Sequence, residues 1–357
     1  MILEFEAFVE IERNMAIASS NEFSGLFSVN MLTGNCEFID MIPNEKIDKD
    51  RLYTKALYVN NKVYFIPYAA KEIAVYNLKT KKVYKISVKE VIDREKKLYR
   101  KNAKFNGGII YKEFVYMIPC TYPGVLRINT NTDCVDYFDD WVNEEPYIFR
   151  KSPCIVGSKF YIPSVLDNSV LIFDMEHCKG KIKHIGKSNN GSWSICKNNQ
   201  ELWFAPKNSG SVVRWNLETN YVKEYDAYPE NFQGNNFLFT KAFVHESNIY
   251  MIPAFANMAI KVDCTTGEIQ KFDIQEIGEN SIVYFMFETI KEIYLKIVRG
   301  TERKYIKISK IDLHIQEYVF MFSIGRDLYE KSYFENRGDL LKEKNCFRLE
   351  EFLKKLL

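Results

Sequence analysis

Short apolar runs, rich in aromatic and β-branched residues, recur along the chain, and each run is followed by a polar turn. These runs lack the spacing of about 3.6 residues that marks the apolar face of an amphipathic helix. Aromatic residues make up 15% of the sequence, with 23 Tyr and 26 Phe, and this content favours strands over helices. The pattern therefore predicts an all-β fold.

A turn of the form Asn/Asp-x-x-Thr follows an apolar run at regular intervals. Its chemistry suits a tight hairpin, because an Asn or Asp side chain accepts hydrogen bonds from the backbone two residues further on. Successive turns begin 42 to 52 residues apart. Intact copies begin at Asn30, Asn77, Asn129, Asn216 and Asp263, and degenerate copies begin at Asp174 and Ser309.

A proline marks a second position in phase with these turns. Because proline cannot donate to a β-ladder, it is expected to end a strand. Each unit of about 47 residues then reads as four antiparallel strands, with the proline after the second strand and the Asn/Asp turn after the third. The prolines close the segments "YFIP", "YMIP", "FYIP", "WFAP" and "YMIP" at Pro67, Pro119, Pro163, Pro206 and Pro253.

Seven units of four strands predict a seven-bladed β-propeller, since one four-stranded sheet cannot bury both faces whereas stacked blades can. We assign residues 1–320 to the propeller. The first and last blades each contain four candidate strands, so the ring closes either without strand exchange or by pairing of the 2–8 segment with the last blade. The blades are expected at 5–45, 52–88, 103–140, 150–186, 191–226, 240–274 and 282–320.

Two regions lie outside the repeat. Residues 88–101 form a charged insertion with helical character, and residues 321–357 form a C-terminal extension. The end of this extension predicts a short amphipathic helix, expected to pack on the propeller, with docking to a partner as the alternative. The apolar positions at helical spacing are Phe347, Leu349, Phe352, Leu353, Leu356 and Leu357.

Composition narrows the class of protein. The net charge is only +2 with a pI near 7.9, which argues against a nucleic-acid or membrane-surface binder. No apolar run approaches the ~18 residues of a membrane span. Glu4 and Glu6 stand where a signal peptide needs basic residues. The eight cysteines occur singly, without zinc-site spacing, so we expect free thiols in a cytoplasmic protein.

Two repeats carry a family resemblance. The segments "LWFAPKNSGSVVRWNLETNYVKEY" and "IYMIPAFANMAIKVDCTTGEIQKF" resemble repeats of the virginiamycin B lyase and NHL-like propellers. The resemblance implies the propeller scaffold. In the lyase family, His and Glu surround a divalent metal in the late blades. Here the matching stretches offer only His245, and Ala205–Pro206 replace the acid, so neither the catalysis nor a metal or other cofactor is expected.

Candidate binding residues come from the loops at one end of a propeller, where ligands usually bind. Twelve residues before the proline, three blades place a lysine where the first strand begins. The share of Lys and Arg in the whole sequence predicts only about one basic residue among seven such positions. These are Lys55, Lys151 and Lys241, either solvated surface lysines or a basic ring facing an anionic ligand. We align Trp193 with them, as a stacking platform, by assuming a longer turn in the fifth blade. Further ligand candidates are Lys104, Arg150, Tyr122, Asn168, Asn208 and Asn257.

No catalytic constellation can be identified. His177, Cys178 and His184 bracket one hairpin, but a fourth metal ligand is not evident, so we predict no metal site. Neither a nucleophile triad nor a phosphate-binding glycine loop occurs. We expect a cytoplasmic binding or protein-interaction propeller that takes an anionic small molecule, a glycan or a protein segment at the channel mouth. The alternative is a lyase, hydrolase or isomerase, which converging polar side chains there would favour.

Overall fold

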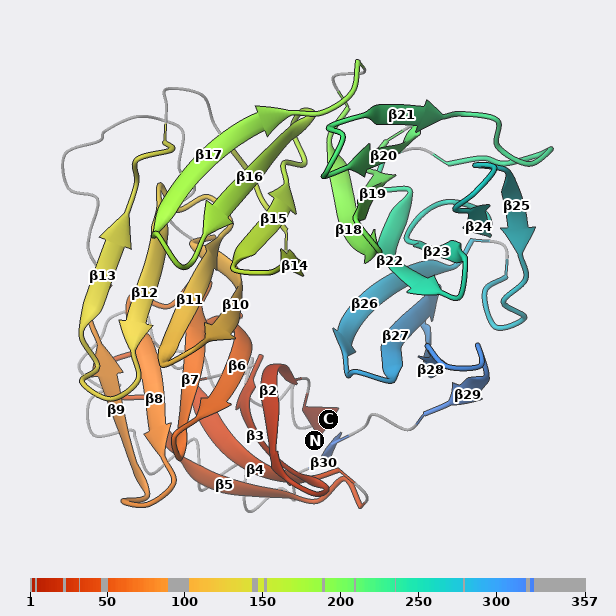
Figure 1. Ribbon diagram of the computed structural model, residues 1–357. Helices are drawn as coiled ribbons and strands as arrows, with labels where there is room; N and C mark the ends of the chain where they lie inside the picture. The colour runs from red at the N-terminus through yellow and green to blue at the C-terminus, as the bar shows by residue number, and fades with distance from the viewer. Residues whose placement is uncertain are drawn as a thin grey trace, which may run out of the picture. The chain divides into compact units, whose positions relative to one another are not determined.

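The computed structural model contains seven four-stranded antiparallel sheets among the residues it describes (Figure 1). These sheets are the blades of a seven-bladed β-propeller, and the predicted fold class is confirmed. The chain divides into two compact units, residues 1–137 with 320–357 and residues 138–319. The described residues are 2–3, 5–21, 24–31, 33–45, 51–88, 103–142, 147–150, 153–187, 190–208, 210–234, 236–278, 280–318 and 322–323.

The first unit holds blades one to three. Blade one comprises β2 (Phe5–Glu12), β3 (Met15–Ser20), β4 (Gly25–Asn30) and β5 (Cys36–Met41). Blade two comprises β6 (Tyr53–Val59), β7 (Lys62–Pro67), β8 (Ile73–Asn77) and β9 (Lys82–Ile86). Blade three comprises β10 (Phe105–Tyr111), β11 (Phe114–Pro119), β12 (Val125–Asn129) and β13 (Val135–Phe138).

The second unit holds blades four to seven. Blade four comprises β14 (Cys154–Val156), β15 (Lys159–Pro163), β16 (Ser169–Asp174) and β17 (Lys179–His184). Blade five comprises β18 (Ser192–Asn198), β19 (Glu201–Pro206), β20 (Val212–Asn216) and β21 (Val222–Tyr225). Blade six comprises β22 (Phe239–His245), β23 (Asn248–Pro253), β24 (Ala259–Asp263) and β25 (Ile269–Phe272). Blade seven comprises β26 (Ile282–Glu288), β27 (Glu292–Arg299), β28 (Glu302–Ser309) and β29 (Ile315–Glu317).

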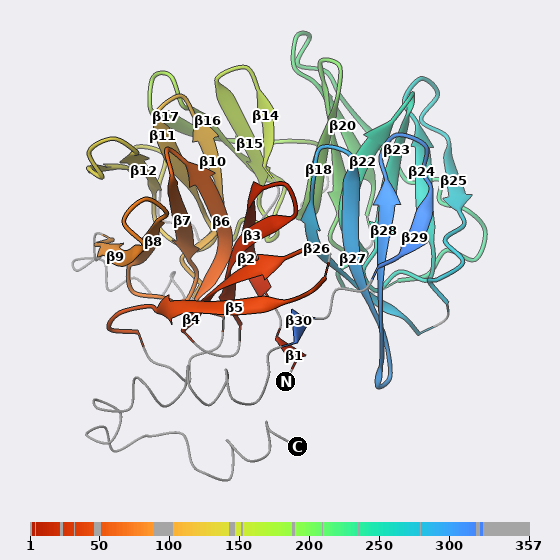
Figure 2. The same cartoon turned by 90° about the horizontal axis from the view of Figure 1, so that it is seen from below.

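Every blade is built from four consecutive strands, so no strand is exchanged between the described blades. The N-terminal segment divides into two parts. Residues from Phe5 onward form β2 of blade one, whereas β1 (Ile2–Leu3) pairs antiparallel with β30 (Phe322–Ser323). Figure 2 shows these two short strands side by side. The N-terminal residues therefore pair with a segment that follows the last blade, not with the last blade itself.

The Asn/Asp turns join the third and fourth strands of each blade, as predicted. In blade five, the backbone N–H groups of Glu218 and Thr219 donate to Asn216 Oδ1 over 3.0 and 2.9 Å. In blade six, Asp263 Oδ1 accepts from the backbone of Thr265 and Thr266. These N–H donors stabilise the carboxylate and lower the pKa of Asp263. The five prolines each end the second strand of a blade, also as predicted.

The apolar runs are continuous rather than alternating because both faces of a blade are buried. Along β7, Val63 and Phe65 pack in the core shared with blade one, whereas Tyr64 and Ile66 pack in the core shared with blade three. Alternate residues of a strand point to opposite faces, so one strand serves two cores. This packing explains why "VYFIP" is apolar at every position.

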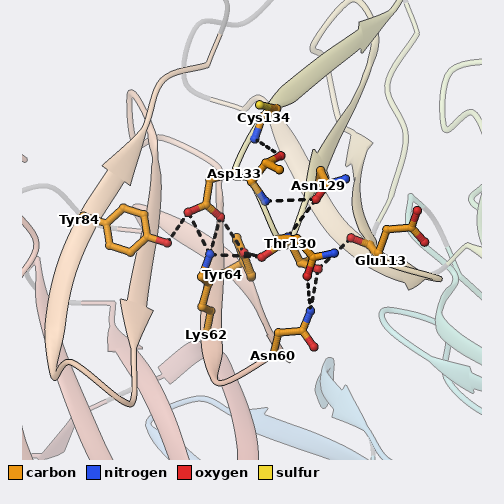
Figure 3. A network of polar contacts seen from close by, with 11 residues as sticks. Asn60, Lys62, Tyr64, Tyr84, Glu113, Asn129, Thr130, Asp133 and Cys134 are labelled. Atoms are coloured by element: carbon orange, nitrogen blue, oxygen red, sulfur yellow. Dashed lines mark hydrogen bonds and ion pairs between the residues drawn. The ribbon is translucent and has the colours of Figure 1, made fainter.

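A polar cluster joins blades two and three within the first unit (Figure 3). Asp133, in the turn between β12 and β13, accepts hydrogen bonds from three groups of blade two. Lys62 Nζ lies 2.9 and 3.0 Å from its carboxylate oxygens, Tyr64 Oη 2.9 Å and Tyr84 Oη 2.7 Å. Lys62 also donates to the carbonyl oxygen of Thr130. We call Asp133, Lys62, Tyr64 and Tyr84 the Asp133 latch.

Several sequence predictions fall on other parts of the chain. The insertion at 88–101, except for Val88, and the predicted C-terminal helix lie outside the described residues. Seven of the eight cysteines are described, and all seven have free thiols. Among the described residues, no helix combines the length and the apolar character needed to cross a membrane.

Candidate functional site

A β-bulge at one register position shapes the first strand of five blades. The ladder between the first and second strands skips one residue there, and this residue lies outside the ladder. A bulge re-aims a side chain, so the side chains of these residues do not follow the alternation of the paired residues on either side. The bulged residues are Glu6, Thr54, Asn106, Trp193 and Thr240.

Bulged residues contact the next blade along the chain. Glu6 forms a bidentate ion pair with Arg51, which immediately precedes blade two. Thr54 donates to the carbonyl oxygen of Phe105 in blade three, and Thr240 accepts from the backbone of Phe285 in blade seven. The repeated bulge thus supplies a link between neighbouring blades.

The position of the bulge shows that the sequence alignment of blade five was wrong by one residue. Lys55 pairs with Ile66 and Lys241 with Ile252, each directly before the proline, and the corresponding partner of Ala205 is Ser194. The turn between β18 and β19 contains two residues, like the turns in blades two and six, so the assumed longer turn is wrong. Trp193 is the bulged residue and not the counterpart of the lysines.

The three candidate lysines have different environments. Lys55 is half-buried on β6 of the first unit, whereas Lys241 on β22 of the second unit is 5% exposed. Lys241 Nζ lies 2.5 Å from Glu288 Oε1, and Lys310 Nζ lies 3.1 Å from Glu288 Oε2. An anion would have to displace Glu288 to reach Lys241. Lys151 lies outside the described residues, so the basic ring stays a prediction.

Trp193 belongs to a chain of aromatic and cationic side chains in the second unit. The guanidinium carbon of Arg150 lies 4.0 Å from the Trp193 ring centre, and the Phe237 ring stands edge-on to Trp193 at 4.6 Å. Lys207 Nζ lies 5.2 Å from the Phe237 ring centre, and the centre of the Phe255 ring lies 6.3 Å from the centre of the Phe237 ring. We call these five residues the Trp193 surface. It joins residues of blades four, five and six.

Two features distinguish the Trp193 surface from core packing. Phe255 is 47% exposed, and Trp193, Phe237, Lys207 and Arg150 are half-buried. Phe237 also has a left-handed backbone with φ 60°, which is rare for an aromatic residue. Such backbone strain is concentrated at functional sites. The surface therefore leaves Phe255 and parts of the other four side chains open to solvent, on β18 and on loops beside the strands.

The candidate asparagines have structural contacts near this surface. Asn257 accepts from the backbone of Gln233 and donates to the carbonyl oxygen of Asn231, so it holds the loop before Phe237. Asn208 follows Lys207, and its buried Oδ1 accepts no hydrogen bond from the described residues. Asn168 contacts His184 Nδ1 and donates to the carbonyl oxygen of Gly186.

Asn168 also lines a small pocket between blades four and five. Asn190 and Ser192 form part of its wall, and Ser192 directly precedes Trp193. The pocket has room for about one water molecule. Small-molecule sites usually enclose about 300–1,000 Å³, so this pocket is too small for a drug-sized ligand.

Two further candidates are engaged in the first unit. Tyr122 is 7% exposed and packs against Phe105 at 4.6 Å and Tyr137 at 5.8 Å, so it belongs to the core between blades two and three. Lys104 Nζ donates to the carbonyl oxygen of Ala70 over 2.8 Å. Both residues tie loops to the core.

Candidate catalytic and metal-binding groups do not converge. Ser169 Oγ contacts both Asp167 and His184, whereas a nucleophile triad requires the imidazole between the hydroxyl and the acid. His177 precedes β17 and His184 ends it, so about 3.3 Å per residue separates them by about 20 Å. The described residues contain no group of three or more His, Cys, Asp or Glu suited to a metal ion.

Comparison with known proteins identifies the fold but no sequence family. No protein-family model matches the sequence, and no curated protein matches it. Solved propeller structures do match. A virginiamycin B lyase from Staphylococcus aureus is 12% identical, with a TM-score of 0.57, covering 82% of this chain and 90% of the lyase. The family resemblance seen in the repeats is therefore confirmed at the level of the scaffold.

Two other proteins that are similar in structure to this chain are not lyases by name. BamB from Moraxella catarrhalis is 10% identical, with a TM-score of 0.56 over 81% of this chain and 80% of that protein. YCF48, solved bound to a D1 peptide, is 9% identical, with a TM-score of 0.56 over 83% of this chain and 90% of that protein. At these identities the similarity establishes the fold alone.

Proposed function

We propose that this propeller binds a segment of another protein on the Trp193 surface. The observation that carries the proposal is the contiguous set Arg150, Trp193, Phe237, Lys207 and Phe255. Trp and Arg dominate the binding energy of protein interfaces, and aromatic residues are enriched there. Binding residues also occur preferentially on loops held by a rigid scaffold.

The loops around this surface have the composition of a protein-binding surface. The stretches "GKSNNGSW" (186–193) and "KNSGS" (207–211) are rich in Gly, Ser and Asn, and "NFQGNNFL" (231–238) adds Phe237. In antibody binding loops, Ser, Gly and Asn provide adaptable hydrogen bonds while aromatic residues provide rigid contact area. The same division of roles supports a binding function here.

A protein segment fits this geometry better than a glycan or a small anion. Sugar stacking requires an open aromatic face, but Arg150 lies over Trp193 and the interplanar angle between Trp193 and Phe237 is 72°. The adjoining pocket has room for only about one water. That YCF48 has been solved with a peptide adds support, because a similar scaffold accommodates such a ligand. The cytoplasmic location expected from the sequence is part of this proposal.

A peptide selection with matched variants tests the function. A library of unstructured 12-residue peptides displayed on phage is selected on the intact protein. Bound clones are then tested against the double variant Trp193→Ala/Phe255→Ala and against Tyr221→Ala. Tyr221 is the matched control, since it is 61% exposed in the same unit and lies outside the Trp193 surface.

We expect the selected peptides to lose at least tenfold in affinity for the double variant and to bind Tyr221→Ala like the wild type. This ratio follows from removing two aromatic contacts worth about 1 kcal/mol or more each. Selected peptides that bind the double variant at full strength, or a selection that yields no binders, would contradict the proposed function.

A further inference from the structure

One aromatic side chain of the Trp193 surface has an unusual backbone. Phe237 lies two residues before β22 and has a left-handed conformation, φ 60°. A residue with a Cβ atom avoids this conformation, so the surrounding contacts must hold it there. The first unit repeats the arrangement, since Arg51 lies two residues before β6 and has φ 54°.

Both left-handed residues contact the bulged residue of the preceding blade. Arg51 forms the bidentate ion pair with Glu6 of blade one. Phe237 meets Trp193 of blade five edge-on at 4.6 Å, and its ring centre lies 6.3 Å from that of Phe255. The ion pair needs charged atoms in fixed directions, whereas another aromatic ring can make the same ring contacts. The place of Phe237 is therefore one that a foreign ring can take.

Phe237 lies at the edge of the core and not inside it. Leu238 and Phe239, the next two residues, are buried in the core between blades five and six. Phe237 does not occur among the described residues of that core, and its side chain is half-buried. Moving this side chain therefore uncovers the surface without opening a cavity between the blades.

The connection that carries Phe237 is fixed on both sides of it. On one side, the backbone N–H of Gln233 donates to Asn257 Oδ1 over 2.8 Å, and the backbone N–H of Asn257 donates to the carbonyl oxygen of Gln233 over 2.9 Å. On the other side, the backbone N–H of Phe255 donates to the carbonyl oxygen of Phe237, and that of Leu238 to the loop after β19. The Phe237 side chain can therefore swing out while no strand loses its pairing.

We infer that Phe237 is a built-in occupant of an aromatic seat formed by Trp193, Lys207 and Phe255, and that the bound segment inserts an aromatic side chain in its place. The inference rests on the proposed function and names the anchor of the partner. A ring in this position contacts both aromatic rings and Lys207 Nζ, which lies 5.2 Å from the Phe237 ring centre. Displacement also frees Phe237 from its left-handed backbone.

A cationic side chain is the competing anchor, because aromatic seats also bind cations. Here Lys207 already places an ammonium group against the ring position. A lysine from the partner would meet this like charge at close range, whereas a neutral aromatic ring gains a favourable contact with it. The geometry therefore favours an aromatic anchor, and a lysine anchor serves as an outcome of the test.

The test uses the tightest-binding peptide from the phage selection on the intact protein, labelled with fluorescein. Its aromatic residue is replaced in turn by Leu and by Lys. Fluorescence anisotropy measures the binding of each peptide to the wild type and to Phe237→Ala, Phe237→Leu, Phe255→Ala and Tyr221→Ala. Circular dichroism and thermal unfolding verify that each variant is folded.

We expect Phe237→Ala to bind the aromatic peptide about fivefold more tightly than the wild type, because no occupant has to leave the seat first. Phe237→Leu leaves a smaller side chain there and should give an intermediate affinity. The Leu and Lys peptides should bind at least about threefold more weakly than the aromatic one, since they lack the ring contacts. Phe255→Ala should weaken the aromatic peptide, and Tyr221→Ala should leave its affinity unchanged.

The outcomes separate the two proposals. Selected peptides without an aromatic residue, or a Leu or Lys peptide that binds as tightly as the aromatic one, would overturn the aromatic anchor and leave the binding function standing. Weaker or unchanged binding to Phe237→Ala would overturn the role of Phe237 as an occupant. If Phe237→Ala does not fold, the comparison of Phe237→Leu with the wild type decides in the same way. If no peptide binds, or if Trp193→Ala/Phe255→Ala binds the peptide at full strength, both proposals fail.

Discussion

Replacing Asp133 by Asn should destabilise the protein by about 2 kcal/mol at pH 7. The substitution preserves the side chain's shape, and Asn tolerates the left-handed backbone of this position, φ 57°. It removes the charge that faces Lys62 and turns an amide N–H₂ toward donors that need an acceptor. The change therefore tests the Asp133 latch and not the turn that carries it (Figure 3).

The magnitude follows from the burial of the pair. Breaking a fully buried ion pair costs about 3–5 kcal/mol, and one net hydrogen bond to a charged group contributes about 1.5–3 kcal/mol. The side chains of Lys62 and Asp133 are 16% and 25% exposed, so solvent screens part of the interaction. The side-chain amide that D133N introduces still accepts one hydrogen bond. The expected loss of stability, about 2 kcal/mol, therefore lies within the range for one hydrogen bond to a charged group.

The stability difference should depend on pH in a defined direction. Burial by itself raises the pKa of Asp133, but hydrogen bonds from Tyr84, Lys62 and Tyr64 and the charge of Lys62 lower it below its ordinary value. A group with a lowered folded pKa stabilises the protein above its unfolded pKa, and the effect is lost as the pH falls through the folded pKa. The difference between wild type and D133N should therefore shrink below about pH 4.

A double-mutant cycle in urea isolates the interaction. The free energy of unfolding is measured for wild type, D133N, Lys62→Met and the double variant at pH 7 and pH 3.5. Asp136→Asn in the same hairpin is the control, because the Asp136 side chain is 46% exposed in its pair with Arg127 and should cost less than about 1 kcal/mol. A coupling energy near zero, or equal losses for D133N and Asp136→Asn, would refute the reasoning.

Three other predictions follow from the fold. Glu288→Gln should lower the free energy of unfolding by about 3 kcal/mol, because it leaves the buried Lys241 ammonium without its counter-ion, whereas Lys310→Met should cost less. Thermal unfolding measures both losses of stability, and a larger loss for Lys310→Met than for Glu288→Gln would contradict this prediction. Asn216→Ala should cost about 1 kcal/mol by removing the acceptor for the turn backbone, and an unchanged urea midpoint would argue against that role. All eight cysteines should react with a thiol reagent in denatured protein without reductant, and a disulfide found by mass spectrometry would contradict this expectation.

The candidate surface could be predicted only in part from sequence. The sequence placed Trp193 at the start of a first strand, Arg150 beside the candidate Lys151 and the asparagines in loops, but the grouping of Trp193 and Arg150 with Lys207, Phe237 and Phe255 depends on contacts between blades. The prolines fixed the strand ends, whereas the bulge at Trp193 has no signal within one repeat. It emerges only from the paired register of β18 and β19.

The amino-acid sequence by itself determined the repeating architecture. Each Asn/Asp turn and each strand-ending proline acts through its own neighbouring backbone, so their spacing specified seven blades of four strands without knowledge of other parts of the chain. Tertiary structure decided which charges are neutralised. Lys62 meets Asp133 across 71 residues, and Lys241 meets Glu288 across 47. Such partners come together only when blades stack. Lys62 and Lys241, which the sequence alone would place on the surface, are then wholly or partly buried against these carboxylates.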